Sequence, residues 1–117
     1  MEITKVATDN RGDVFLFENG KRTHMIVSIN KGLSRGGHSH TGDQWHICLG
    51  GQMTVRVLSP DTGLERVFSM VEGDAECIPA GHPHLFTAEE DSVVAESRMG
   101  PENTVDYEPY RAIARPL

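Results

Sequence analysis

The sequence predicts an all-β fold, and two features of its patterning support this. Glycine and proline interrupt short apolar runs along the whole chain, which has 12 glycines and 6 prolines in 117 residues. The runs between them alternate in polarity or are rich in β-branched residues, as β-strands are. The turns recur about every eight to twelve residues, a spacing typical of a sandwich or barrel. We find no convincing amphipathic helix in the pattern.

The strands can be placed in order between the turns. Residues 14–17 and 23–29 are predicted to form a hairpin, because Asn19-Gly20 between them is a strong turn signal. Residues 32–37 are expected to form a flexible loop. Further strands are expected at residues 38–40, 44–49, 53–58, 65–70, 75–78, 84–87 and 93–97. Prolines in the segment from Met99 onward predict an extended arm, with one short helix near residues 110–114.

Length and composition limit the class of protein. At 117 residues the chain suits one domain, with a core at about residues 14–97 and a C-terminal arm at 98–117. The net charge of −6 argues against nucleic-acid binding, which needs a basic surface. No run of about 18 apolar residues is present, and the first residues lack the features of a signal peptide. Two cysteines form no disulfide framework. We therefore expect a cytoplasmic protein with reduced thiols and no membrane partner.

Three histidines lie in two segments bounded by glycines. His38 and His40 follow Gly32-Leu-Ser-Arg-Gly-Gly, and His84 follows Pro79-Ala-Gly81-His-Pro. Side chains two residues apart on a strand point to the same face, so His38 and His40 form half of a metal site. A solvated pair of surface histidines is the alternative. The third histidine behind a Pro-x-Gly turn favours the metal site.

The two segments resemble the two motifs of the cupin superfamily. The first motif is Gly, five residues, His-x-His, three or four residues, Glu, six residues, Gly; the second is Gly, five residues, Pro-x-Gly, two residues, His, three residues, Asn. Every spacing fits, but Gln44 stands in the position of Glu and Ala88 in the position of Asn. The resemblance implies a cupin jelly-roll β-barrel or sandwich. It also implies that a divalent transition metal is held by His38, His40, Gln44 and His84.

The expected ligands suit Fe, Mn, Zn or Ni, because imidazole suits Fe, Zn and Ni and an oxygen ligand extends the range toward Mn. Gln44 does not ionise, so a divalent ion would keep its full charge and bind more weakly than with Glu. Asp43 and Asp74 lie off the expected ligand spacing. The alternative is that Gln44 is an interior hydrogen-bonding residue in a cavity that holds no metal.

Two further residues are candidates for catalysis. His46 shares the parity of Gln44, so it should face inward as a general base or as an orienting group. Arg35 lies in the expected loop before His38, where it could hold a carboxylate or phosphate at the mouth of the cavity. A structural histidine and a solvated arginine are the alternatives.

The resemblance leaves the reaction open, because the cupin fold carries many activities. The first hypothesis is a metal-dependent isomerase, lyase or dioxygenase that acts on a small polar molecule, such as a sugar or carboxylic acid. The second is a metal-free enzyme similar to the nucleotide-sugar ketoisomerases, in which His38 and His40 would shuttle protons. The third is a small-molecule-binding protein without catalysis.

A homodimer is also expected. Open sandwiches have exposed edge strands that must be covered, and twofold pairing is the commonest way to cover them. Trp45 and Ile47 have the parity opposite to Gln44, so they are available for packing between layers or at a contact between subunits.

Overall fold

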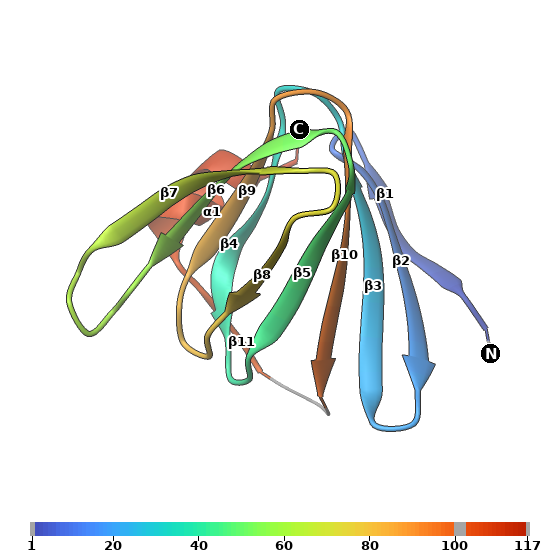
Figure 1. Ribbon diagram of the computed structural model, residues 1–117, viewed down its shortest axis with the longest axis horizontal. Helices are drawn as coiled ribbons and strands as arrows, with labels where there is room; N and C mark the ends of the chain where they lie inside the picture. The colour runs from blue at the N-terminus through green and yellow to red at the C-terminus, as the bar shows by residue number, and fades with distance from the viewer. Residues whose placement is uncertain (1, 100–102, 117) are drawn as a thin grey trace.

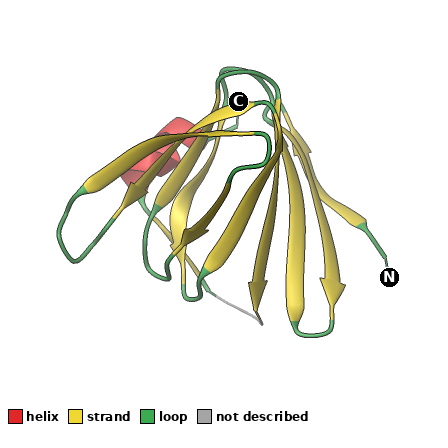
Figure 2. Cartoon of the chain, in the orientation of Figure 1, coloured by secondary structure: helices red, strands yellow, loops and turns green. Residues whose placement is uncertain are grey.

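The computed structural model describes residues 2–99 and 103–116. Most of these residues lie in β-strands, with one short helix near the C-terminal end (Figure 2). The strands are β1 Thr4–Asp9, β2 Gly12–Asn19, β3 Arg22–Ile29, β4 Ser34–His40, β5 Gln44–Gly50, β6 Gln52–Leu58, β7 Glu65–Val71, β8 Ala75–Ile78, β9 His84–Ala88, β10 Ser92–Met99 and β11 Thr104–Asp106. The helix is α1, Glu108–Ala114.

The strands form two antiparallel sheets. The strand order is β1-β2-β3-β10-β5-β8 in the first sheet and β11-β4-β9-β6-β7 in the second. Both sheets contribute to one apolar core, in which residues such as Val27 and Val94 of the first pack with Val55 and Phe86 of the second. The sheets therefore form the predicted sandwich. Helix α1 covers the second sheet from outside, beside β4 and β9 (Figure 1).

Predictions that rested on turn-forming residues are confirmed. The hairpin of β2 and β3 closes at Asn19 and Arg22, around the predicted Asn-Gly turn. The short helix is present and begins slightly earlier than expected, with Pro109 in its first turn. Strands β1 and β11 were not among the expected strands. Both are edge strands, and both owe their structure to pairing with a neighbour: β1 with β2, and β11 with β4.

The expected loop at residues 32–37 is wrong from Ser34 onward. Strand β4 begins there and pairs with β9, with Ser34 opposite Thr87 and Arg35 opposite Phe86. A register shift then separates Gly36 from His38. The glycines suggested flexibility, but their positive φ angles of 111° at Gly36 and 88° at Gly37 serve this bulge. The hydrogen bonds that order the segment come from a distant strand, which the local pattern does not reveal.

Helix α1 packs very closely over this bulge. A Cβ atom at Gly37 would lie 2.5 Å from the Cα atom of Arg111. Tyr110 and Ala114 of the helix are buried, and they pack with Leu85 of β9. The missing side chain at Gly37 thus allows α1 to lie directly against β4.

We expect Gly37→Ala to destabilise the fold. The positive φ costs about 1–2 kcal/mol for a residue with a Cβ atom, and the clash with α1 costs about 1–3 kcal/mol more. Gly32→Ala is the matched control, because Gly32 has a φ of 83° and a Cβ atom added there would meet no atom within 4 Å. Urea unfolding should therefore show a larger loss for Gly37→Ala. Equal losses in the two variants would contradict close packing of α1 on β4.

The outer face of the first sheet has exposed apolar side chains. Alternation along β5 buries Gln44, His46 and Cys48, while Trp45, Ile47 and Leu49 are exposed. This confirms the predicted parity of the strand. The expected homodimer stays a prediction, and these outward side chains are the surface on which it would form.

Among the described residues, no helix has the length and apolar character needed to cross a membrane.

Candidate metal centre

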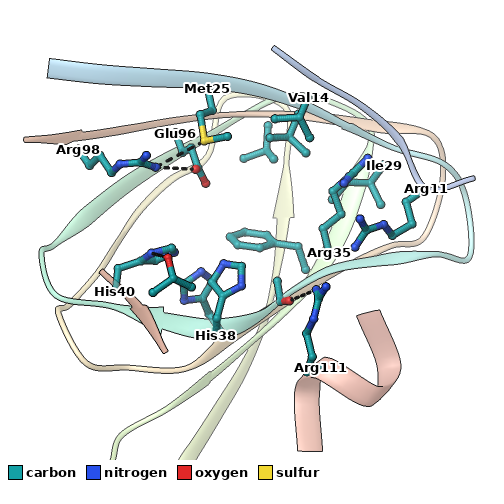
Figure 3. A pocket seen from close by; sticks show the side chains of 16 residues that line it. Arg11, Val14, Met25, Ile29, Arg35, His38, His40, Glu96, Arg98 and Arg111 are labelled. Carbon is teal, nitrogen blue, oxygen red and sulfur yellow. Dashed lines mark hydrogen bonds and ion pairs between the residues drawn. The ribbon is translucent and has the colours of Figure 1, made fainter. Parts of the chain in front are cut away.

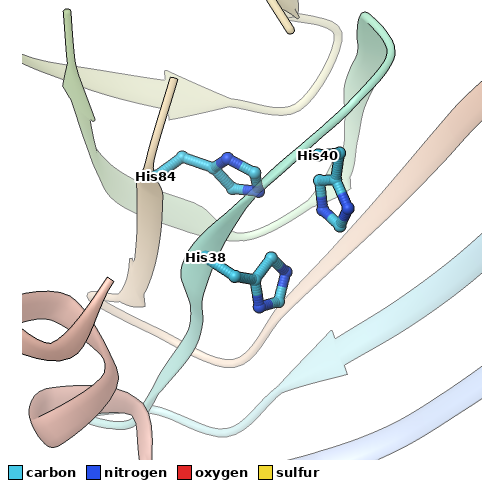
Figure 4. Close-up of side chains that lie close together, drawn as sticks. All are labelled: His38, His40 and His84. Carbon is cyan, nitrogen blue, oxygen red and sulfur yellow. The ribbon is translucent and has the colours of Figure 1, made fainter. Parts of the chain in front are cut away.

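His38, His40 and His84 come together between the two sheets. His38 of β4 pairs directly with His84 of β9 across the ladder, and His40 follows on the same face of β4. One nitrogen atom from each ring lies within 4.8 Å of the others. The ring centroids are 4.6 Å apart for His38 and His40, and 5.4 Å for His38 and His84. Figure 4 shows the three rings turned toward one another, an arrangement that suits a single metal ion.

Both the tautomer of His84 and the protonation of the cluster suit metal binding. His84 Nδ1 lies 3.1 Å from the carbonyl oxygen of His82, so Nδ1 carries the proton and Nε2 is free to bind. Burial lowers the pKa of each of the three histidines to about 4, and neighbouring imidazoles add to the effect. The three rings are therefore neutral at pH 7, the form in which imidazole binds a metal.

The cluster forms part of the wall of a cavity of about 330 Å³. Arg35 also lines this cavity, and its side chain is buried. Its expected position in a flexible loop is wrong, because it lies within β4. In Figure 3 the labelled histidines lie on the left of the cavity and Arg11, Arg35 and Arg111 on the right.

Gln44 and His46 are buried on the inward face of β5, as their parity predicted. Neither belongs to the wall of the cavity, which includes His38, His40 and His84. His46 Nε2 lies 3.1 Å from Glu96 Oε2, so His46 reaches the cavity through that carboxylate. The roles of Gln44 as a ligand and His46 as a base stay predictions.

Glu96 is the acidic residue that sequence reasoning missed. It lies on β10 directly opposite His46 of β5, and it lines the cavity. Its second carboxylate oxygen, Oε1, lies 3.7 Å from Arg98. Burial opposes ionisation of Glu96, but the hydrogen bond from His46 and the Coulombic interactions with His46, His84 and His40, which apply in acid where these rings are protonated, lower its pKa to about 2. Glu96 therefore places a negative charge in the cavity that contains the three histidines.

The two aspartates considered from the sequence have other roles. Asp43 accepts a hydrogen bond from the backbone N–H of Ala80, which joins the two histidine-bearing segments. Asp74 accepts one from the backbone N–H of Val71 in its own turn. Neither lines the cavity. No local spacing could identify Glu96, because only the pairing of β10 with β5 brings it to the site.

We expect the metal-free protein to lose stability in acid. The three histidines titrate near 6.5 when unfolded and near 4 when folded, so the unfolded chain binds more protons between these values. Their contribution is complete above pH 6.5 and is lost as the pH falls to 4. Glu96 extends the loss below pH 4.5, because its folded pKa is about 2. Urea unfolding in a chelator at pH 7, 5.5 and 4.5 checks this, and equal stability at all three values would contradict it.

Comparison with known proteins gives matches in structure. No protein-family model matches the sequence, and neither does any curated protein. Bacillus subtilis oxalate decarboxylase, a protein with Mn(II) centres, matches with a TM-score of 0.79 and 19% identity over 95% of this chain and 32% of the other. Lactobacillus farciminis oxalate decarboxylase matches with a TM-score of 0.78 and 21% identity over 93% and 35% of the chains.

A third match is the capsular polysaccharide assembling protein CapF from Staphylococcus aureus, with a TM-score of 0.74 and 16% identity over 86% and 31% of the chains. This chain thus spans about a third of the length of the proteins it matches. Identities this low establish the fold alone. The antiparallel sandwich and these neighbours agree, and the chain has the cupin fold that its two histidine-bearing segments predicted.

Proposed function

We propose that this protein is a metal-dependent enzyme that acts on a small polar molecule inside the sandwich, as an isomerase, lyase or dioxygenase. The observation that carries the proposal is the convergence of three neutral imidazoles at one end of a cavity. Most ligand cavities measure roughly 300–1,000 Å³, so a cavity of about 330 Å³ suits a small ligand such as a short carboxylic acid or a sugar.

The donor set fits a divalent transition metal. His38, His40 and His84 would hold the ion, and Gln44 is the proposed fourth ligand. Imidazole donors suit Fe, Zn and Ni, and an oxygen ligand extends the range to Mn. The Mn(II) centres of the Bacillus subtilis enzyme make manganese the first metal to test. A bound ion would supply Lewis acidity toward an oxygen atom of the ligand.

The protein's own side chains would bind and orient the ligand. Arg35 would hold an acidic or polar group by its guanidinium. Glu96 would offset the charge of the ion, because a carboxylate with a pKa of about 2 is a weak base and a persistent anion. His46 would position Glu96 through their hydrogen bond. The alternative role for His46, hydrogen-bonded to Glu96, is the general base that the sequence predicted.

Protein purified without a histidine tag would test the proposal. Metal analysis should find one divalent ion per chain. After chelation and reloading with Mn(II), Fe(II), Zn(II) or Ni(II), NMR should detect metal-dependent consumption of a compound from a panel of small carboxylic acids and sugars. Consumption that persists without metal would favour the ketoisomerase-like alternative with His38 and His40 as proton shuttles. Metal binding without any consumption would favour a binding protein.

We expect Gln44→Glu to tighten metal binding. The substitution adds a negative charge of nearly the same shape at the proposed fourth ligand, and a charged ligand attracts a divalent ion more strongly. The affinity for Mn(II), measured by calorimetry at pH 7, should rise by about 10-fold or more. An unchanged affinity would remove Gln44 from the ligand set and leave it as an interior hydrogen-bonding residue.

A further inference from the structure

The cavity is cationic although the protein is acidic. The chain has a net charge of −6, yet Arg11, Arg35, Arg98 and Arg111 all line the cavity, against one acidic residue, Glu96, among the described residues of its wall. Such a concentration of one sign in a low-dielectric cleft attracts ligands of the opposite charge. A ligand would bind those guanidinium groups that a carboxylate does not already hold.

Arg11 and Arg98 already face carboxylates. Arg11 Nη2 lies 2.7 Å from Asp9 Oδ2, and its Nε also donates to Asp9. Arg11 lowers the pKa of Asp9 to about 2, chiefly through these hydrogen bonds. Arg11 Nη1 donates to the carbonyl oxygen of Ala114 at the end of α1. Arg98 lies 3.7 Å from Glu96.

The positive charge of Arg35 is much less completely compensated by nearby acceptors. It is 9% exposed, and its Nε donates to the carbonyl oxygen of Ser28. Its Nη2 is 3.5 Å from Asp9, which Arg11 already binds, and this buried Nη2 makes no hydrogen bond to the described residues. A buried cationic donor without an acceptor is costly unless another group supplies one.

Arg111 reaches the same end of the cavity from helix α1. Its Nη1 donates to the carbonyl oxygen of Gly36 at 3.3 Å. The close approach of α1 to Gly37 places the start of this side chain against the glycine bulge of β4. In Figure 3 its side chain rises from α1, and its guanidinium lies below Arg35 and to the right of His38. Within the described part of the chain this hydrogen bond goes to a neutral carbonyl, and no carboxylate forms an ion pair with Arg111.

We infer that Arg35 and Arg111 form an anion-binding subsite that grips the acidic group of a small carboxylic acid, while the opposite end of that acid faces the three histidines. Guanidinium groups match the planar carboxylate and bind it with charge-assisted hydrogen bonds. The subsite makes a carboxylic acid the expected ligand of the proposed site. What happens to the bound acid therefore rests on the proposed function. Binding at the two arginines does not require the metal.

The position of the subsite also predicts the form of the ligand. Arg35 and Arg111 lie on the right of the cavity in Figure 3, and His38 and His40 lie on the left. An acid with a second polar group can therefore contact both ends, while acetate can contact one. A dicarboxylate should bind the metal-loaded protein more tightly than acetate does.

Calorimetry with the full chain would test the inference, using acetate, oxalate, malonate, succinate and inorganic phosphate as probes. Each is titrated into chelator-treated protein and into Mn(II)-loaded protein. We expect Arg111→Gln and Arg35→Gln to weaken dicarboxylate binding by about 10-fold to 100-fold, the range for loss of a charge-assisted contact. Arg111→Lys should recover part of the affinity and leave it salt-dependent. Arg66→Gln is the matched control, because Arg66 makes an exposed ion pair with Glu76 outside the cavity.

The outcomes separate the two proposals. If no metal binds but the acids bind in a manner that depends on Arg111, the subsite is supported and the proposed function fails. If metal binds but both arginine variants bind the acids as tightly as Arg66→Gln, the subsite is overturned and the metal site stands. Tighter binding of phosphate than of every carboxylate would also overturn the assignment to a carboxylic acid. If Arg35→Gln does not fold, Arg111→Gln decides, because Arg111 is only partly buried.

Discussion

Replacing His84 with alanine should abolish metal binding by the protein. His84 is 3% exposed, its Nδ1 is hydrogen-bonded to a carbonyl oxygen, and one of its ring nitrogens lies within 4.8 Å of a ring nitrogen of His38 and of His40. Loss of one of three imidazole ligands should weaken binding by at least about 100-fold, because even the outer partners of metal ligands are worth about 10-fold to 100-fold. Titration with Mn(II) measures the effect, and circular dichroism checks that the variant is folded.

His82→Ala is the matched control for this prediction. It removes an imidazole two residues away, outside the wall of the cavity, and keeps the backbone carbonyl that orients His84. Its metal affinity should equal that of the unmodified protein. If His82→Ala and His84→Ala lose metal equally, or if neither loses it, the assignment of His84 as a ligand is wrong.

Glu96→Gln should produce the second large effect, a weaker affinity for the metal with little change in the fold. Glutamine has the same shape and can still accept the hydrogen bond from His46, but it removes the negative charge from the cavity. Glu96 lies close enough to raise the pKa of His38, His40 and His84, against the larger effect of burial. A charge that stabilises a proton on these rings also stabilises a metal ion there.

We expect Mn(II) affinity to fall by about 10-fold to 100-fold in Glu96→Gln, as for other groups beyond the ligands themselves. Glu90→Gln makes the same change of charge at an exposed turn, and it should leave the affinity unchanged. Equal affinities in Glu96→Gln and Glu90→Gln would show that Glu96 does not compensate the charge of the ion. Any small change in Mn(II) affinity would then come from the change in the protein's total charge.

The fold and half of the site could be predicted from local pattern. The alternation of β5 and the Asn-Gly turn before β3 are properties of neighbouring residues, and both are confirmed. The three histidines could be predicted because each lies in a segment whose spacing resembles a known motif. Their convergence in the structure supports that interpretation.

The rest of the site depends on contacts between distant parts of the chain. Glu96 faces the cavity because β10 pairs with β5, 50 residues away from His46 along the sequence. Arg111 reaches the cavity because α1 packs against Gly37. Neither residue has a local signal, since a lone glutamate on a strand and a lone arginine in a tail are common on protein surfaces. The first part of strand β4, residues 34–37, escaped prediction for the same reason, because its partner β9 orders it.

A crystal structure of the Mn(II)-loaded protein, with anomalous diffraction to locate the metal, tests the central claim most directly. The three-histidine site predicts one anomalous peak between His38, His40 and His84, at about 2.0–2.2 Å from one nitrogen atom of each ring. A peak bound to other residues, or a loaded crystal with no peak at this cluster, would contradict the account.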